Sequence, residues 1–365
     1  MRRRDLLLAT GLVVPGAFAA STTSSAERPP RPVGIAMVGL GGYGRLVMER
    51  TRGLPQIVVT GLVSGDERRA ATIAHEYGIP ADAVYGYDNF DRLAQDDRID
   101  AVHICLPVGL HAQFAERALK AGKHVICEKP LAASSAEARR LARLAVERGR
   151  VLMPAYRAWF SAHVQEVRRR VVEATHGHLV AIDAHKGFRM ELPAGNWRFD
   201  PKLAGGGCLY DIGVYSVQLC RWLGGGVPTR VSAMTGHDPS RPHAIEDHVA
   251  FTFEFQNGAI ATGSASWRHR LQNRLHVATR DSWMSLDPAT PAIGERLTIG
   301  LERPNRTEEL GLPVTDQLPR MYQHFADCIT ARATPQLTAE DAIDDLRVME
   351  AIYASAEQRR AVSVI

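Results

Sequence analysis

The first half of the chain alternates short apolar runs with segments of helical periodicity. Continuous apolar runs are typical of strands covered on both faces, and a helix between successive runs indicates parallel crossovers. The expected strands cover 33–38, 57–63, a short run near 84, 101–106, 124–127 and 151–153. The first expected helix ends near residue 52, and the others cover 67–77, 89–95, 111–121 and 134–148. This alternation predicts an α/β domain with a doubly wound parallel sheet over residues 33–156.

The pattern changes after about residue 156. Longer segments now alternate apolar and polar residues, which is typical of antiparallel strands with one buried face. These segments cover 179–185, 227–236, 248–256, 259–267 and 275–279. Asn257-Gly258 between two of them predicts a tight hairpin, and 339–360 is an amphipathic helix. We therefore expect an α+β domain over 157–340 with a large open, mostly antiparallel sheet, followed by a C-terminal helix over 341–365.

Three arginines and a short apolar stretch open the chain, in MRRRDLLLATGLVVPGAFAA. Arg3-Arg4 followed by Asp5 and two leucines predicts a twin-arginine export signal over 1–19, and so a periplasmic protein. An ordinary secretory signal and a basic tail are the alternatives. The apolar stretch is too short to span a bilayer, and no other stretch is long and apolar enough to do so. Residues 20–32 are expected to form a Pro-rich arm.

Charge and cysteine content exclude several classes of protein. The 365 residues include 44 Lys+Arg and 40 Asp+Glu, a formal charge of +4; residues 1–19 hold three Arg and one Asp, so +2 remains after them. This balance gives no electrostatic case for nucleic acid or an anionic membrane as a partner. The five cysteines are odd in number and lack C-x-x-C spacing, so we expect neither a disulfide framework nor a metal site.

Gly39, Gly41 and Gly44 form a G-x-G-x-x-G motif between the first strand and the first helix. The first glycine permits a tight turn, the second lets the backbone approach a pyrophosphate, and the third allows close packing of helix on strand. Unpaired N–H groups at the helix start then face the phosphates. The sequence therefore predicts a dinucleotide-binding Rossmann domain, with a ligand-free glycine turn as the alternative.

The second strand ends at Ser64, where NAD enzymes normally have an acidic residue that binds the ribose hydroxyls. A hydroxyl here and the guanidinium groups of Arg68 and Arg69 suit a 2′-phosphate, which favours NADP over NAD. Asp66 is the competing candidate, because it can turn toward a ribose. A solvated helix face is the alternative role of the two arginines.

Two further stretches carry candidate proton-transfer groups. Glu128-Lys129-Pro130 follows the fifth strand at the edge of the sheet where ligands bind in such folds. Asp211 and Tyr215 lie four residues apart in a helix-like stretch after three glycines, so they share one face. A phenol beside an ammonium suits proton transfer in alcohol–carbonyl chemistry. A surface lysine and a structural Asp/Tyr pair are the alternatives for each stretch taken alone.

Together these motifs resemble the glucose–fructose oxidoreductase / inositol dehydrogenase / rhizopine-catabolism (Gfo/Idh/MocA) family over 33–360. The resemblance is carried by Leu106-Pro107…His111, Lys-Ala-Gly-Lys-His at 120–124, Glu-Lys-Pro at 128–130 and Asp-Ile-Gly-x-Tyr at 211–215. The chain most resembles the exported glucose–fructose oxidoreductase branch, which has Tyr where many relatives have His. The resemblance implies that Lys129 and Tyr215 act on the substrate hydroxyl, supported by Asp211.

The resemblance also implies a full set of cofactor contacts and an oligomer. The cofactor residues are Gly39, Gly41, Gly42, Tyr43, Gly44, Ser64, Arg69, Leu106, Pro107, His111, Glu128 and Lys129. The branch assembles as a tetramer whose N-terminal arm shields bound NADP, and here the arm is shorter. We expect a homodimer or homotetramer formed through the open sheet.

Candidate substrate contacts follow from position and residue type. Tyr156 and Arg157 leave the last strand of the first domain near the cleft, and Trp197 suits stacking on a sugar ring. Tyr215 completes this set. His163 and His185 are lesser candidates, for which packing is an equally good explanation.

The resulting hypothesis is a periplasmic NADP-dependent sugar oxidoreductase. Hydride would pass between a sugar or polyol C–OH and tightly bound nicotinamide. Tyr215 would take the hydroxyl proton, the Lys129 ammonium would favour the phenolate, and Asp211 would orient that pair. A second carbonyl sugar would recycle the cofactor. Three alternatives remain open: a conventional NAD(P)-dependent sugar dehydrogenase or reductase with exchangeable cofactor, a redox-neutral NAD-dependent glycosidase, and a non-catalytic sugar-binding protein.

Overall fold

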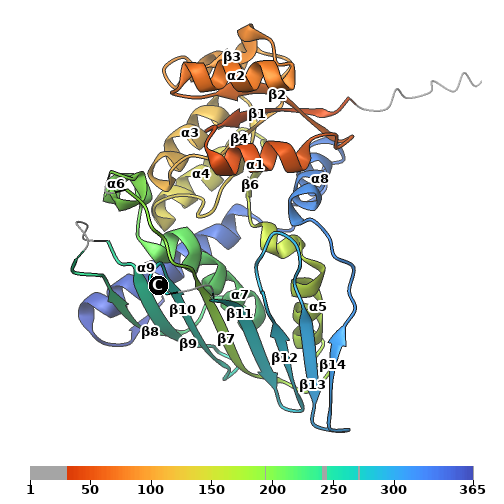
Figure 1. Cartoon of the computed structure of the whole chain (residues 1–365), viewed down its shortest axis with the longest axis vertical. Coiled ribbons are helices and arrows are strands. Elements are labelled where there is room, and N and C mark those ends of the chain that lie inside the picture. The colour runs from red at the N-terminus through yellow and green to blue at the C-terminus, as the bar shows by residue number, and fades with distance from the viewer. Residues whose placement is uncertain (1–30, 194, 241–244, 270–271, 365) are drawn as a thin grey trace, which may run out of the picture. The chain divides into compact units, whose positions relative to one another are not determined.

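The computed structural model of the chain describes residues 31–193, 195–240, 245–269 and 272–364. It contains two β-sheets, each with helices beside it (Figure 1). The expected export signal over 1–19 lies outside the described residues, as does all but the end of the expected arm over 20–32.

The first sheet is the predicted doubly wound parallel sheet. Its strands are β1 (Val33–Val38), β2 (Ile57–Val63), β3 (Val84–Tyr85), β4 (Ala101–Ile104), β5 (His124–Cys127) and β6 (Leu152–Pro154). Their order is β3-β2-β1-β4-β5-β6, and every neighbouring pair is parallel. All residues of β1 and β4 are buried, which accounts for their continuous apolar runs.

The connecting helices are α1 (Gly42–Thr51), α2 (Glu67–Tyr77), α3 (Val108–Lys120) and α4 (Ser135–Glu147). Helix α3 begins three residues before the predicted start at His111, because Pro107 occupies its N-cap and the helix forms directly after it. The helix expected over 89–95 is a 3₁₀ helix at Phe90–Gln95.

The second sheet is large and mostly antiparallel, as predicted. Its strands are β7 (Leu179–Gly187), β8 (Arg230–Gly236), β9 (His248–Glu254), β10 (Ile260–Ser266), β11 (Gln272–Thr279), β12 (Ser282–Leu286), β13 (Leu297–Leu301), β14 (Arg306–Leu310) and β15 (Val362–Ser363). The order is β14-β13-β12-β11-β7-β10-β9-β8-β15, and only the β7–β10 pair among them is parallel. Asn257-Gly258 joins β9 to β10 in the predicted hairpin, with Gly258 at φ +85°.

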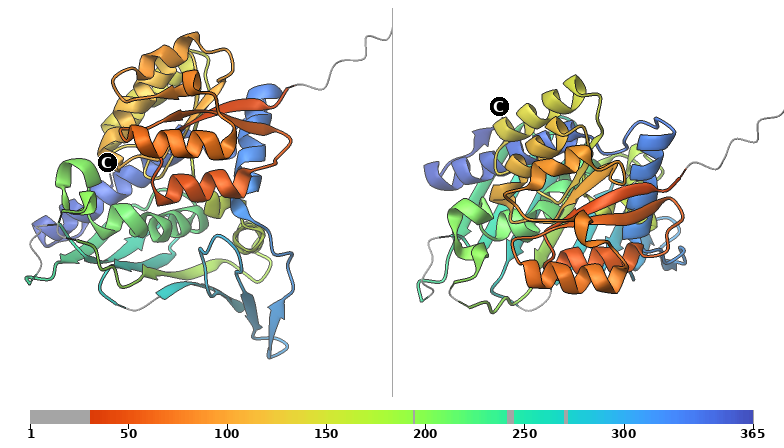
Figure 2. Two further views of the ribbon diagram at one scale, coloured as in Figure 1. Left: turned by 45° about the horizontal axis from the view of Figure 1, so that its top comes forward. Right: turned by 90° about the horizontal axis from the view of Figure 1, so that it is seen from above.

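Helices α7 (Val214–Gly224) and α9 (Ala339–Gln358) lie on one face of this sheet, against β7 and β10 and against β8 respectively (Figure 2). The guanidinium of Arg221 joins the two helices, since its Nε donates to the fully buried Asp345 carboxylate at 2.7 Å. The same domain also contains α5 (Ala162–Val172) and the short helix α6 (Pro201–Ala204). None of the helices in the described parts of the chain has the length and apolar character needed to cross a membrane.

The C-terminal part of the chain returns to the first domain. Helix α8 (Gln317–Thr330) falls within the range expected for the second domain, yet it packs against α1, β1 and β2. The Arg50 side chain of α1 donates to the Asp316 carboxylate just before α8 at 2.6 Å. The two domains are therefore joined through more than one segment of the chain.

Candidate active site

A cavity of about 570 Å³ lies where the carboxyl ends of the parallel strands face the second domain. The first domain contributes the glycine loop, the tip of β2 and the segments that follow β4 and β5. The second domain contributes Phe188, Trp197, Arg198, Tyr210, Asp211, Tyr215 and Trp267. In open α/β sheets this edge is where ligands bind.

The three motif glycines differ in how closely the protein surrounds them. Gly39 has φ +93°, and a Cβ there would lie 2.5 Å from the Cys105 carbonyl oxygen. A Cβ on Gly44 would lie 2.3 Å from the Gly39 carbonyl oxygen. A Cβ on Gly41 would have no protein atom within 4 Å. The fold itself requires Gly39 and Gly44, whereas Gly41 leaves open space in the cavity wall.

The start of helix α1 is suited to an anion. Gly41 is its N-cap and supplies no side-chain acceptor, so the N–H groups of the first turn have no capping side chain. Gly42 and Tyr43, both predicted cofactor residues, line the cavity at this point. Free donors, the positive helix end and open space beside Gly41 together fit a dinucleotide pyrophosphate.

Asp66 at the tip of β2 lines the cavity, but protein groups already engage its carboxylate. The Asp66 carboxylate caps helix α2 by accepting from the Arg69 backbone N–H at 3.0 Å, and it also lies 3.3 Å from the Arg69 guanidinium. The Ser64 hydroxyl accepts from the Asp66 N–H at 3.0 Å. Ser64 and Arg69 both line the cavity, as does Tyr87, which sequence reasoning missed.

His111 lines the cavity, but both of its ring nitrogens already contact backbone carbonyl oxygens. Nδ1 lies 2.7 Å from the Pro130 carbonyl oxygen and Nε2 lies 2.8 Å from the Leu106 carbonyl oxygen. Burial lowers the pKa of this imidazole. His111 therefore fixes the segments after β4 and β5 beside each other; both segments, with Leu106, Pro107, Glu128 and Lys129, line the cavity as predicted.

The three predicted catalytic residues come together across the domain boundary. The Lys129 ammonium donates to the Asp211 backbone carbonyl at 2.5 Å and lies 5.2 Å from the centroid of the Tyr215 ring. The Asp211 carboxylate accepts from Arg198 Nε at 3.3 Å and from Trp267 Nε1 at 3.2 Å. Asp211 thus positions Lys129 through its backbone, while its side chain positions Arg198 and Trp267.

Local backbone geometry produces this arrangement. Leu209–Gly213 forms a π-helical turn, after which α7 begins at Val214. A π turn leaves carbonyl groups outside the regular α-helical pattern, and such turns are frequent at functional sites. The sequence indicated only a continuous helix here, but Asp211 and Tyr215 still face the same cavity.

Two more cations lie around the Tyr215 ring. Lys186 Nζ lies 4.3 Å from the ring centroid, and the Arg157 guanidinium carbon lies 5.2 Å from it. Lys186 donates to the hydroxyl and the carbonyl of Thr290. Burial and the nearby charges of Arg157 and Lys129 lower the pKa of Lys186. Lys186 was not identified from the sequence. The only signal for it is a lysine in a strand that otherwise alternates apolar and polar residues.

Two predicted substrate residues, Tyr156 and Arg157, are not among the residues that line the cavity. Tyr156 is fully buried against Trp222, at a ring distance of 6.2 Å, and does not line the cavity. Arg157 is also buried, and its guanidinium donates to the carbonyls of Pro291 and Thr290. A 3₁₀ turn at Arg157–Phe160 follows β6 at once and directs both side chains inward. Neither residue lines the cavity, and their role as substrate contacts stays a prediction.

Trp197 does line the cavity, as predicted, with the Arg198 guanidinium 4.4 Å from its ring centroid. Phe188 and Trp267 add further aromatic surface there. The lesser candidates lie outside the cavity: His163 is buried in α5, and His185 contacts the Ser264 hydroxyl at 2.7 Å. The second-domain wall therefore offers aromatic faces and one arginine beside the lysine–tyrosine pair.

Comparisons with known proteins agree with this geometry. Residues 33–156 match the oxidoreductase family with an NAD-binding Rossmann fold, and residues 164–284 match the GFO/IDH/MocA C-terminal domain. The chain is 33% identical over 306 residues to D-xylose 1-dehydrogenase (NADP(+)) 2 of Haloferax volcanii, covering 83% of this chain and 91% of that protein.

Two further relatives are similar over most of their length. A dTDP-3,4-didehydro-2,6-dideoxy-alpha-D-glucose 3-reductase of Actinomadura kijaniata is 27% identical, over 89% of this chain and 96% of that one. The crystal structure of aldose-aldose oxidoreductase from Caulobacter crescentus complexed with glycerol superposes with a TM-score of 0.87 at 34% identity, covering 91% of this chain and 100% of that one.

Replacing Gly41 separates cofactor binding from folding. Gly41 has φ −74° and open space around it, so Gly41→Ala should lower the free energy of unfolding by no more than about 1 kcal/mol, the cost of a poorer N-cap. The added methyl should weaken dinucleotide binding by about tenfold or more, because it occupies the space for the pyrophosphate. Fluorescence titration with NADP and thermal denaturation measure the two effects.

Gly39→Ala is the matched contrast, since its φ of +93° and the 2.5 Å approach to the Cys105 carbonyl make it costly to the fold itself. Wild-type affinity in Gly41→Ala would contradict the placement of the phosphates.

Proposed function

The chain belongs to the GFO/IDH/MocA oxidoreductase family, and we propose that it is an NADP-dependent enzyme that transfers hydride between a sugar or polyol C–OH group and the nicotinamide. One observation carries the proposal. The Lys129–Tyr215 pair lies in the same cavity as the glycine loop, so a proton-transfer group and a dinucleotide site converge. Both relatives with the highest identities quoted above are named as enzymes acting on sugars.

In this mechanism the nicotinamide, when bound, accepts or returns the hydride. Tyr215 receives the proton of the substrate hydroxyl during oxidation and returns it during reduction. The Lys129 ammonium and the Arg157 guanidinium lie beside the phenol ring, where their charge stabilises an alkoxide that develops on the substrate. The Asp211 carbonyl fixes the position of the Lys129 ammonium. Trp197 and Trp267 offer apolar faces for a sugar ring.

NADP is favoured over NAD by the tip of β2. Ser64, Asp66 and Arg69 all line the cavity, but the Asp66 carboxylate already caps α2 and pairs with the Arg69 guanidinium at 3.3 Å. A hydroxyl and a guanidinium suit a 2′-phosphate. The Haloferax volcanii relative is named for NADP(+), which supports the same choice.

We further propose that the cofactor stays bound and is recycled by a second sugar, in the periplasm. The twin-arginine pattern at Arg3-Arg4 and the resemblance to the exported glucose–fructose oxidoreductase branch support this. The Caulobacter crescentus relative is named an aldose-aldose oxidoreductase, and this name refers to two aldoses. The open face of the second sheet would form the contact between subunits of a homodimer or homotetramer.

The second candidate is a conventional sugar dehydrogenase whose cofactor exchanges at each turnover. The specific observation for it is the 33% identity to a protein named D-xylose 1-dehydrogenase. Both candidates use the same residues, and they differ only in the fate of the reduced cofactor.

Tyr215→Phe tests the proton-transfer role. It should lower kcat by about 10²- to 10⁴-fold, the usual contribution of a positioned acid–base group, while NADP affinity stays unchanged. Stopped-flow reduction and a binding titration measure the two quantities. Tyr210→Phe is the control, because this phenol lines the same cavity but donates to the Ala133 carbonyl at 3.1 Å. Near-normal kcat in Tyr215→Phe would sink the assignment.

Arg69→Ala tests cofactor choice. Loss of a charged hydrogen bond, worth about 1.5–3 kcal/mol, should raise the Kd for NADP by about 10- to 100-fold. The Kd for NAD should not rise, because NAD lacks the 2′-phosphate. Arg68→Ala is the control: Arg68 is exposed on the same helix and does not line the cavity. Equal loss of affinity for NAD and NADP in Arg69→Ala would contradict the assignment.

The state of the purified protein separates the two candidates. For recycling, the protein should co-purify with one nicotinamide nucleotide per chain, identified by mass after denaturation. A single addition of an aldose should then reduce that nucleotide, and a second carbonyl sugar should reoxidise it on the protein. Loss of all nucleotide on gel filtration, with turnover restored by added NADP, would establish the conventional dehydrogenase instead.

A further inference from the structure

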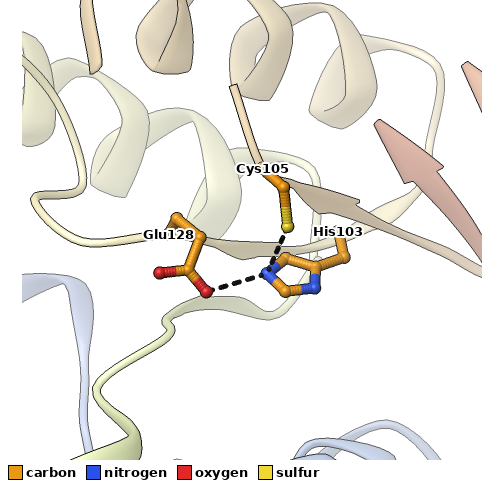
Figure 3. A group of neighbouring side chains, drawn as sticks. All are labelled: His103, Cys105 and Glu128. Atoms are coloured by element: carbon orange, nitrogen blue, oxygen red, sulfur yellow. Dashed lines mark hydrogen bonds and ion pairs between the residues drawn. The ribbon is translucent and has the colours of Figure 1, made fainter. Parts of the chain in front are cut away.

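His103, Cys105 and Glu128 converge at the carboxyl ends of two neighbouring strands. His103 and Cys105 are two residues apart at the end of β4, so their side chains leave the same face of the sheet. The register pairs His103 with Ile126 and Ile104 with Cys127, which brings Cys105 beside Glu128. Figure 3 shows the three side chains pointing toward one another, with one nitrogen of the His103 ring joined to both the Cys105 sulfur and a Glu128 oxygen.

The distances fit the ligand sphere of one cation. His103 Nε2 lies 3.4 Å from Cys105 Sγ and 3.4 Å from Glu128 Oε1, and all three ligand atoms lie within 4.8 Å of one another. In a tetrahedral zinc site, bonds of about 2.0–2.1 Å to N and O and about 2.3 Å to S place neighbouring ligands about 3.3–3.6 Å apart. The cluster therefore needs only small side-chain shifts to bind zinc.

A second observation also indicates a missing ligand. Glu128 Oε1 is buried and accepts no hydrogen bond from the residues that the structure describes. The Glu128 side chain is 9% exposed, and its Oε1 lies 3.4 Å from His103 Nε2 without forming a hydrogen bond, which is costly for a buried carboxylate oxygen. A cation between Glu128 and His103 would provide that partner.

The other side of the His103 ring is already arranged for metal binding. Its Nδ1 contacts the Tyr322 hydroxyl, and both residues are buried. Metal-binding histidines usually direct their second nitrogen to such a hydrogen-bond partner, which fixes the tautomer and the ring orientation. This contact leaves Nε2 facing Cys105 and Glu128.

We propose that His103, Cys105 and Glu128 form a zinc site in the wall of the cofactor cavity. One thiolate and one carboxylate balance the charge of Zn²⁺, and a sulfur and an imidazole ligand select zinc over magnesium or calcium. Cys105 and Glu128 both line the cavity, so the fourth coordination position faces it and is open to water or a ligand oxygen. The proposed hydride transfer does not require this site, and the spacing of the cysteines alone gave no sign of it.

Cobalt substitution tests the site directly. The full chain is stripped with a chelator and titrated with Co²⁺, whose tetrahedral thiolate complexes absorb strongly. The wild type should bind one equivalent with a thiolate-to-cobalt band that Zn²⁺ abolishes. Cys105→Ser should lose that band. Cys127→Ser should keep it, because this buried thiol contacts the Leu131 carbonyl instead, at 3.7 Å.

Two further variants keep the test decisive if Cys105→Ser does not fold, as judged by circular dichroism. His103→Gln should abolish the tetrahedral spectrum. Tyr322→Phe should weaken zinc binding by about 10- to 100-fold, the usual effect of removing a residue that hydrogen-bonds to a metal ligand. No thiolate-to-cobalt band in the wild type, or a band unchanged in His103→Gln or Cys105→Ser, overturns the proposal. The cluster is then a metal-free ion pair of His103 and Glu128.

Discussion

A single hydrogen bond between the two domains sets the geometry of the whole site. The Lys129 ammonium comes from the nucleotide-binding domain, and the Asp211 carbonyl that accepts from it, at 2.5 Å, belongs to the second domain. Lys129 reaches the Tyr215 ring only because that carbonyl fixes its position. The Asp211 carboxylate at the same time fixes Arg198 and Trp267 on the opposite wall. Asp211 therefore holds side chains of both domains in place around the cavity.

Much of the fold could be predicted from the sequence because buried segments have a characteristic pattern of apolar residues. The apolar runs of β1 and β4 predicted a parallel sheet, and Asn257-Gly258 predicted a hairpin, since each pattern has one favourable local structure. The outer strands β12, β13 and β14 were missed. The second domain's boundary also failed to capture α8, because no local pattern shows which domain a helix packs against.

The site residues also divide into those that a local motif predicts and those that only the folded structure brings together. Gly39, Gly41 and Lys129 lie in motifs whose chemistry depends on local backbone, and the structure places them together. Tyr156, directly before the 3₁₀ turn that follows β6, is fully buried, which its position in the sequence did not indicate. Lys186 was missed because only the pairing of distant segments brings it to the Tyr215 ring. The grouping of His103, Cys105 and Glu128 likewise depends on strand register, which sequence spacing does not encode.

The return of the C-terminal helices to the first domain has a consequence for how the molecule is divided. Helix α8 covers α1, β1 and β2, and the Ser135 N–H and hydroxyl of α4 both donate to the Glu350 carboxylate of α9, at 2.7 and 2.8 Å. The nucleotide-binding part is thus discontinuous in sequence and is completed by the last fifty residues of the chain. A fragment that ends at residue 156 would expose the surface that α8 covers and would lose the Ser135–Glu350 hydrogen bonds.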